Sequence, residues 1–202
     1  MRDGHIGFIK TPVQGNVLID GVLWCADNGC YGKGYPGDEG WLRWLKNLQH
    51  RADTCLFATA PDVVGDAEAS LARSRPFLPK IRELGFKAAL VAQDGMEKMD
   101  LPWDEFDVLF LGGRKTDNPD DEWKISPAAI ELAREARRRG KWVHAGRVNS
   151  NKRYKLLAGT PEDPICHSCD GTYLRFGPEI NTPKLLGWIS DWKQQDGLFS
   201  AL

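Results

Sequence analysis

The sequence contains no apolar run long enough to cross a bilayer, which argues against a transmembrane helix. No apolar signal region follows Met1, so we expect a cytoplasmic protein with no membrane partner. There is also almost no net charge, because 27 Lys and Arg residues face 28 Asp and Glu residues and leave −1. This balance excludes a global electrostatic attraction to nucleic acid, although the charges are not spread evenly along the chain.

Cysteine is scarce, and the number of cysteines, five, is odd. Cys25 and Cys55 lie in apolar runs, where buried thiols are expected. Cys166 and Cys169 have the Cys-x-x-Cys spacing of a zinc site, but no second pair accompanies them. Because a structural zinc site usually needs four ligands, we predict no metal. A zinc site completed by His167 or by a distant cysteine stays the alternative.

A short apolar run, a polar or Gly-rich exit and an amphipathic helix recur along the chain. The composition, 42% hydrophobic and 27% charged, is typical of one soluble globular domain, residues 1–202. The predicted strands are 6–10, 22–26, 55–60, 88–92, 108–111, 142–144 and a short one that ends at Asp170. The predicted helices are 39–49, 67–84, 127–139, 152–158 and 178–192, with the second kinked or divided by Pro76 and Pro79.

The alternation of strands and helices indicates parallel strands joined by crossover helices, and so an α/β fold. A doubly wound sheet would gather its ligand contacts at one switch point, whereas the polar exits here are spread over many strand ends. We therefore predict a (β/α) TIM-like barrel, compact or irregular because 202 residues are few for such a barrel. The polar segment 114–124 is predicted to be a mobile loop.

Four acidic residues stand at strand exits: Asp27, Asp62, Asp94 and Asp170. A single acid at such a place is usually a helix cap or a turn residue. Four acids that converge on one barrel mouth indicate chemistry instead. Paired carboxylates are suited to glycosyl transfer, because one attacks the anomeric carbon while the other moves protons.

Other residues at strand exits are candidate ligand contacts. Gly112 and Gly113 allow a flat ligand or a phosphate to approach the backbone closely, or form only a turn. Arg147 is placed to hold a phosphate or a carboxylate. His144 is either a ligand contact or a buried, hydrogen-bonded histidine. The remaining candidate substrate contacts are Gln93 and Asn149.

Basic residues crowd one stretch, from Arg134 to Lys155. This stretch is either a solvated helix face or a patch that contacts phosphates. In the last helix, the apolar side chains are predicted to face inward: Leu185, Leu186, Trp188 and Ile189.

Several motifs resemble those of the tRNA-guanine transglycosylases and their phage-encoded relatives. Residues 26–31, Ala-Asp-Asn-Gly-Cys-Tyr, are similar to the Asp-Ser-Gly-Gly-Tyr type motif of the tRNA enzymes. Residues 60–66, 111–113, 144–150 and 168–173 are similar to motifs of the diverged, phage-encoded relatives. Those relatives act on DNA in the 7-deazaguanine modification pathways of bacteriophages. The resemblance runs from about Phe8 to Trp188 and depends on the order and spacing of the motifs.

The resemblance implies a base-exchanging TIM barrel. Asp170 matches the nucleophilic aspartate that attacks C1′ and expels guanine, and Asp27 matches the general acid/base. Asp62 matches the acid that reads the amino and imino edge of the base. Gly112 and Gly113 match glycines whose backbone contacts the base carbonyl. No cofactor is needed, because one N-glycosidic bond replaces another.

The sequence departs from the tRNA enzymes in two places. Asn28 replaces the usual Ser after the acid, and the C-terminal zinc motif and RNA-binding extension are missing. The second departure favours DNA over tRNA as the polymer partner, beside a free 7-deazaguanine base, and leaves an oligomer open. A phage-encoded protein would act in the host cytoplasm. Two alternatives remain: a small phosphate-binding barrel enzyme that acts on a free metabolite, and a non-catalytic module that binds a deazapurine or DNA.

Overall fold

The computed structural model describes residues 6–194. The strands are β1 (Phe8–Lys10), β2 (Trp24–Ala26), β3 (Cys55–Thr59), β4 (Ala88–Ala92), β5 (Val108–Leu111), β6 (Trp142–Ala145) and β7 (Ser168–Cys169). The α-helices are α1 (Asp38–Asn47), α2 (Ala67–Ser74), α3 (Leu78–Glu83), α4 (Pro127–Arg138), α5 (Asn151–Ala158) and α6 (Pro178–Gln194). Short 3₁₀ helices are η1 (Gln49–Thr54), η2 (Met96–Lys98), η3 (Pro119–Asp121), η4 (Trp123–Ile125) and η5 (Tyr173–Arg175). Each predicted strand and helix is present, with ends that differ by a few residues.

The strands follow one another in the sheet in the order of the chain. β1 pairs with β2, β2 with β3, and β3 with β4, all of them parallel. β6 pairs with β7 in the same sense, with His144 opposite Ser168. The predicted parallel α/β architecture is therefore confirmed. Closure into a complete barrel is a prediction that these pairings do not test.

The chain divides into two compact units, of which the first ends at Phe110 and the second begins at Leu111. The division falls within β5, so this strand contributes residues to both units. The two units are described separately below. The prediction of one domain over residues 1–202 stays a prediction.

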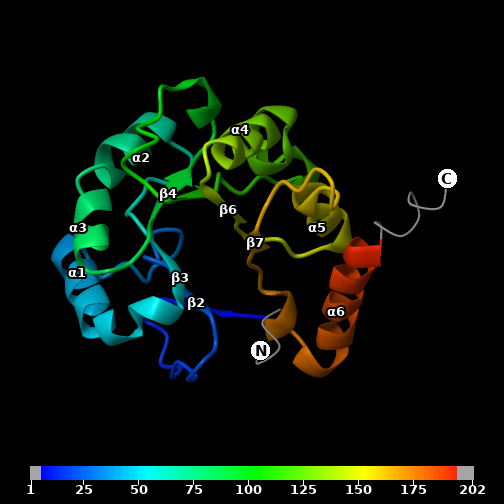
Figure 1. The fold of residues 1–202 in the computed structure, drawn as a ribbon, viewed down its shortest axis with the longest axis horizontal. Helices are drawn as coiled ribbons and strands as arrows, with labels where there is room; N and C mark the ends of the chain where they lie inside the picture. Colours follow the sequence, from blue (N-terminus) through cyan, green and yellow to red (C-terminus); the bar gives the residue numbers. More distant parts are fainter. Residues whose placement is uncertain (1–5, 195–202) are drawn as a thin grey trace. The chain divides into compact units, whose positions relative to one another are not determined.

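In the first unit, α2 and α3 pack on β4 and α1 packs against α3, and Figure 1 shows the three helices along one side of β2, β3 and β4. All five residues of β4 are buried, as its continuous apolar sequence predicts for a strand covered on both faces. Helix α1 buries Trp41 and Leu45, which are four residues apart and so lie on one helix face. Phe57 of β3 is also fully buried.

The predicted division of the helix at 67–84 is confirmed. Helix α2 begins after Asp66, whose side chain accepts a hydrogen bond from the Ala69 N–H and so caps the helix. It ends before Pro76, and α3 begins two residues later with a proline in its first turn. Gly85, with φ of 84°, follows α3 and turns the chain toward β4.

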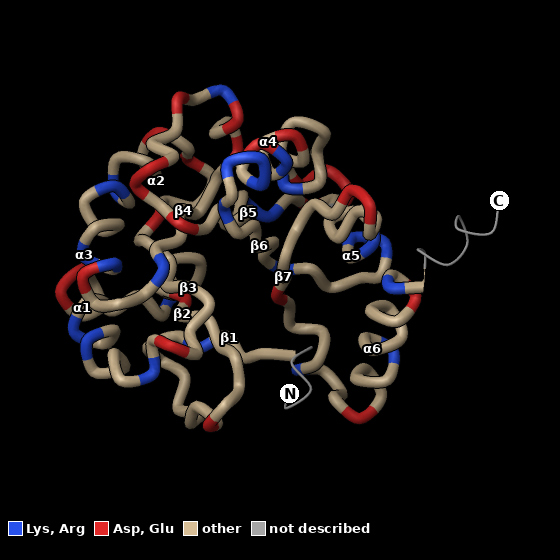
Figure 2. The backbone as a smooth tube through the Cα atoms, in the orientation of Figure 1, with Lys and Arg blue, Asp and Glu red and all other residues tan. Residues whose placement is uncertain are grey.

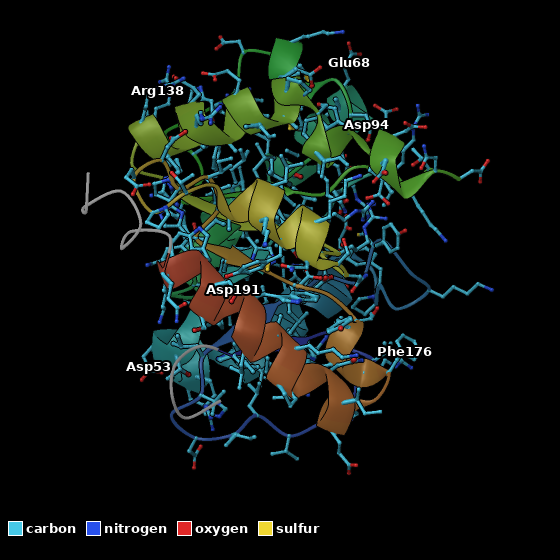
Figure 3. The ribbon with its side chains drawn as sticks, turned by 90° about the vertical axis from the view of Figure 1, so that its right-hand side faces the viewer. Asp53, Glu68, Asp94, Arg138, Phe176 and Asp191 are labelled. Carbon is cyan, nitrogen blue, oxygen red and sulfur yellow. The ribbon has the colours of Figure 1, made fainter. Side chains whose placement is uncertain are left out.

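In the second unit, α4 packs on β6, and α5 packs against α6. Helix α4 is capped by Ser126, whose hydroxyl accepts from the Ala129 N–H. Its buried face is a stripe of small and aliphatic residues: Ala129, Leu132, Ala133 and Ala136. Figure 3 shows α6, in orange to red, alongside α5 in yellow, with Asp191 on the outer side of α6.

The prediction that the apolar residues of α6 face inward is only partly right. Leu186 is 42% exposed, and no described residue of α6 is fully buried. Trp188 does pack inward, because its ring lies 4.8 Å from the ring of Tyr173 and 6.2 Å from that of Tyr154. Helix α6 therefore covers the second unit through aromatic contacts rather than through a continuous apolar stripe.

Within residues 6–194, no helix has the length and the apolar character that a membrane span requires.

Candidate functional site

The candidate residues of the first unit gather around the buried carboxyl of Asp62. Its Oδ2 accepts a hydrogen bond of 2.8 Å from Gln93 Nε2, and its Oδ1 accepts one of 3.3 Å from Asn28 Nδ2. Asp62 follows β3, Gln93 follows β4 and Asn28 follows β2. The structure therefore brings together two predicted site residues, Asp62 and Gln93, and a third that had been noted only as a departure from the family motif.

Both amides are oriented by the backbone. The Gly65 N–H donates to Gln93 Oε1 at 2.8 Å, which leaves Gln93 Nε2 to face Asp62. The Cys30 N–H donates to Asn28 Oδ1 at 2.6 Å, and Asn28 Nδ2 also donates to the Ala60 carbonyl. Each amide thus has its acceptor occupied by an N–H group, so its donor is fixed toward the carboxyl of Asp62.

Burial raises the pKa of Asp62 to about 6. The hydrogen bond from Asn28 lowers this pKa, and the neighbouring carboxylate of Asp27 raises it again. A buried carboxyl poised near neutral pH is one of the properties that mark functional sites. At neutral pH most of the population is ionised, and an ionised carboxylate acts only as a hydrogen-bond acceptor.

Asp27 and Asp94 lie at the ends of β2 and β4 and are only partly buried. Asp27 Oδ1 accepts a hydrogen bond of 2.7 Å from the Gly29 N–H, and the Asp27 N–H donates to the Lys10 carbonyl. Asp94 precedes Gly95, whose φ of 97° permits the turn into η2. Asp27 is therefore held by its own turn.

The candidate residues of the second unit gather around Asp170, which directly follows β7. Its Oδ2 lies 3.1 Å from His144 Nε2, and its Oδ1 accepts a hydrogen bond of 3.1 Å from the Arg147 N–H. Its side chain is 21% exposed. Burial raises the pKa of Asp170, but the hydrogen bond from His144, the Arg147 N–H and the charge of Lys124 outweigh burial and hold the pKa below its usual value.

Ser168 fixes the tautomer of His144. Trp142 Nε1, which can only donate, lies 2.9 Å from Ser168 Oγ. The Ser168 hydroxyl is then free to donate to His144 Nδ1, 2.8 Å away. In neutral His144 the proton therefore lies on Nε2, which donates to Asp170. Ser168 was not among the predicted site residues, because a lone serine before a cysteine carries no signal in the sequence.

Arg147 adopts a left-handed backbone conformation, with φ of 60°, which is uncommon for a residue with a side chain. Its Nη2 donates to the carbonyl oxygens of Gly112 and Gly113, at 3.3 and 2.6 Å. These two glycines therefore direct their carbonyl oxygens toward a cation. This arrangement does not support the alternative in which Gly112, Gly113 and Arg147 together hold a phosphate.

The prediction that 114–124 is a mobile loop is wrong for its last residues. Glu122 and Lys124 are buried on either side of the start of η4. Lys124 Nζ lies 2.9 Å from Glu122 Oε2 and donates to the Gly146 carbonyl at 2.7 Å. Arg153 of α5 approaches Glu122 to 3.4 Å. A polar sequence alone indicates exposure. Here the burial of the charges is compensated by the pairing of Glu122 with Lys124 and by Gly146 and Arg153, which are distant in sequence.

Asn149 is exposed and positions the loop after β7. Its Oδ1 accepts hydrogen bonds from the N–H and the hydroxyl of Thr172, at 2.7 and 3.4 Å. A Cβ on Gly171 would lie 2.5 Å from Asn149 Oδ1 and 2.5 Å from the Val148 carbonyl oxygen. The close approach of these two segments therefore requires glycine at position 171, next to Asp170.

The basic stretch is extensively paired. Arg138 forms ion pairs with Glu131 and Glu135 of its own helix, and Figure 2 shows basic and acidic residues together on α4. Arg134 pairs with Asp163, and Lys152 with Asp120. These contacts favour a solvated helix face for this stretch. Binding of DNA phosphates there stays a prediction.

Cys25 and Cys55 are buried, as predicted. Cys166 and Cys169 line a cavity of about 110 Å³ together with Trp192. Burial raises the pKa of Cys169 to about 12, so this thiol is neutral. In residues 6–194, no group of three or more His, Cys, Asp or Glu side chains is arranged to hold a metal ion.

No protein-family model matches the sequence, and no curated protein matches it. Among solved structures, the chain is similar to a chain of the tryptophan synthase complex from Pyrococcus furiosus, with 16% identity and a TM-score of 0.44. The similarity covers 80% of this chain and 62% of that chain, so this chain spans about three fifths of its length. A likeness of this degree gives no basis for inferring an activity.

Proposed function

We propose that the protein is a base-exchange transglycosylase that replaces guanine in a polynucleotide through a covalent intermediate on Asp170. The observation that carries the proposal is the state of the Asp170 carboxylate. It is partly exposed, oriented on both oxygens by His144 and the Arg147 N–H, and its pKa is held low. An ionised and oriented carboxylate is the form that a glycosyl-transfer nucleophile needs.

In the proposed first step, one oxygen of Asp170 forms a bond to C1′ while the bond from C1′ to guanine breaks. Guanine leaves with the electron pair of that bond and takes a proton. In the second step, a ring nitrogen of a free 7-deazaguanine loses its proton and attacks C1′, and Asp170 leaves as a carboxylate. Asp27, partly exposed at the end of β2, is assigned to these proton transfers.

The Asp62 cluster is assigned to base recognition. An ionised carboxylate accepts the two adjacent N–H groups that guanine and 7-deazaguanine present on one edge. Gln93 and Asn28 orient that carboxylate from both sides, so its two oxygens have a fixed direction.

The choice of polymer and incoming base comes from the resemblance of the motifs. Because the relatives that these motifs resemble act on DNA, the proposed substrates are DNA and a free 7-deazaguanine base. tRNA is the second choice of polymer. The experiment is exchange of labelled guanine into duplex DNA, single-stranded DNA and tRNA. Exchange into tRNA alone would replace the DNA assignment and leave the chemistry in place.

The proposed nucleophile is tested with Asp170→Asn, beside Asp191→Asn as a matched control on the exposed side of α6. We expect Asp170→Asn to lower exchange at least about a thousandfold, because no other step replaces the covalent one. The wild type should form an adduct with the polymer that survives denaturation, and Asp170→Asn should form none. Exchange by Asp170→Asn at the wild-type rate would refute the assignment.

A hydrolase is the second candidate, favoured by one observation. Ser168, His144 and Asp170 form a hydrogen-bonded series of hydroxyl, imidazole and carboxylate, the arrangement of acyl-transfer triads. Ser168 Oγ also accepts a hydrogen bond from Trp142 Nε1, which leaves its hydroxyl proton to point toward His144 Nδ1. Ser168→Ala distinguishes the two candidates: a hydrolase loses its activity, whereas base exchange is lowered through the orientation of His144 but retained, because Asp170 is still present.

A further inference from the structure

In the second compact unit of the chain, one backbone peptide group lies between the ammonium of Lys124 and the carboxylate of Asp170. The carbonyl of Gly146 accepts a hydrogen bond of 2.7 Å from Lys124 Nζ. The N–H of Arg147 donates to Asp170 Oδ1 at 3.1 Å. Because this C=O and this N–H belong to the same planar peptide group, the ammonium and the carboxylate hold its opposite ends.

Packing alone does not explain a lysine at position 124. The Lys124 side chain is 0% exposed, and burial of an ammonium is unfavourable unless partners compensate it. Burial lowers the pKa of Lys124 to about 8, the charge of Arg147 lowers it further, and Glu122 raises it. An apolar side chain would fill the same space without the cost of desolvating an ammonium. The positive charge of Lys124 is therefore explained by the groups that it contacts.

We propose that Lys124 is a positioning residue for Asp170 and acts through the peptide group that joins Gly146 to Arg147. An ammonium at the carbonyl end polarises the peptide, and a polarised N–H binds a carboxylate more strongly. The tether also holds the left-handed turn at Arg147, in which this N–H points at Asp170. The role of Asp170 as nucleophile rests on the proposed function, whereas the effect of Lys124 on the Asp170 carboxylate does not.

The charged and titratable groups around the pair are few. Asp170 is faced by His144 of β6, by Arg147 after β6 and by Lys124 of η4, while Cys169 beside it is a neutral thiol. Lys124 is faced by Glu122, by Arg147 and by Arg153 of α5. Glu122 neutralises one positive charge of this group, so a net positive charge stays next to Asp170.

The experiment measures the pKa of Asp170 by carboxyl-carbon NMR in the full chain, for the wild type and for two variants. Lys124→Gln keeps a donor for the Gly146 carbonyl but removes the charge, and Lys124→Met removes both. We expect the Asp170 pKa to rise by about half a unit in Lys124→Gln and by about one unit in Lys124→Met. The acid limb of the pH–rate profile for base exchange should shift to higher pH by the same number of pH units. In both variants kcat should be lowered and KM unchanged.

Two further variants keep the test decisive. Lys152→Gln removes an exposed lysine that pairs with Asp120, and it should leave the Asp170 pKa unchanged. If Lys124→Met does not fold, Lys124→Met combined with Glu122→Gln removes both charges of the buried pair and is measured instead. An unchanged Asp170 pKa in folded Lys124 variants would overturn the proposal, and so would equal shifts in Lys124→Gln and Lys124→Met, because the peptide would then transmit nothing.

The test of the Lys124 positioning role and the test of base exchange can give different results. A rise of the Asp170 pKa in the Lys124 variants, with no base exchange by the wild type on any polymer, would support the positioning role and refute the transglycosylase. Base exchange with an unmoved pKa would support the transglycosylase and refute the positioning role.

Discussion

At the scale of single residues, the two carboxyl groups at the centres of the clusters are shifted in opposite directions. Burial dominates at Asp62 and raises its pKa to about 6, whereas donors and positive charge dominate at Asp170 and lower its pKa. Opposite shifts of this kind assign different roles to two carboxyl groups. Asp170 is the ionised group at all physiological pH values, and Asp62 changes its charge near the acid end of that range.

The raised pKa of Asp62 predicts a pH dependence of stability. The native carboxyl keeps its proton up to about pH 6, whereas the unfolded one releases it near 3.8. The native state then binds more protons between these values, so the free energy of unfolding falls as pH rises from about 4 to about 6. A shift of about two units corresponds to about 3 kcal/mol.

Asp62→Asn removes this titration and also the acceptor for the base. Urea unfolding at pH 4.5, 6 and 7 measures the free energy of unfolding of the wild type and of Asp62→Asn. As pH rises, the free energy of the wild type should fall relative to that of the variant. The same variant should raise KM for the base. Parallel pH profiles for the two proteins would contradict the prediction.

The residues that sequence reasoning found and missed differ in a physical way. Asp62 and Asp170 follow apolar strands, and this position alone marks them. Asn28 and Ser168 act by orienting a neighbour, Asp62 in one case and His144 in the other. Such roles depend on partners far away in the sequence, so no local pattern reports them.

At the scale of elements, the strands were predictable where burial is complete. β4 and β5 have the predicted ends because every residue in them is apolar and buried. Prolines likewise marked the division between α2 and α3. The segment before α4 was mispredicted, because the buried charges of Glu122 and Lys124 are compensated by the Gly146 carbonyl and by Arg153 of α5, which are distant in sequence.

The tight contact between the segments after β6 and β7 predicts the effect of Gly171→Ala. The added Cβ would lie 2.5 Å from the Val148 carbonyl oxygen, which is backbone and cannot rotate away. We expect a destabilisation of about 1–3 kcal/mol and weaker activity, because the loop that carries Asp170 must move. Urea unfolding of the variant measures the first effect.

Gly187→Ala in α6 is the matched control for Gly171→Ala. A Cβ at position 187 meets nothing within 4 Å, and alanine favours a helix, so stability should stay the same or rise by up to about 1 kcal/mol. Equal effects of the two substitutions would show that the close approach at Gly171 is not important for stability.

At the scale of the whole molecule, a net charge close to zero and ion pairs between neighbouring side chains limit electrostatic attraction to DNA. The net charge is −1, and Arg138 already contacts Glu131 and Glu135. We therefore expect Arg138→Gln to change the Kd for DNA less than about twofold, and to leave the slope of log K against log salt unchanged. Fluorescence anisotropy at several salt concentrations checks both. A slope smaller by about one unit would show that Arg138 contacts a phosphate.

The parallel α/β architecture was predictable from the alternation of apolar runs and amphipathic helices, because this pattern repeats along the whole chain. Neither the closure of the sheet nor the placement of Asp27 relative to Asp170 follows from that pattern. Both depend on long-range geometry that local sequence does not encode.

The left-handed backbone at Arg147 has a consequence for any attempt to make the protein more heat-resistant. Glycine would relieve the unfavourable φ of 60°, so selection for thermal tolerance alone should favour Arg147→Gly. The same change would release the carbonyls of Gly112 and Gly113 from the guanidinium. Natural chains that keep arginine at this turn would thus be retaining local instability in exchange for an ordered reaction centre.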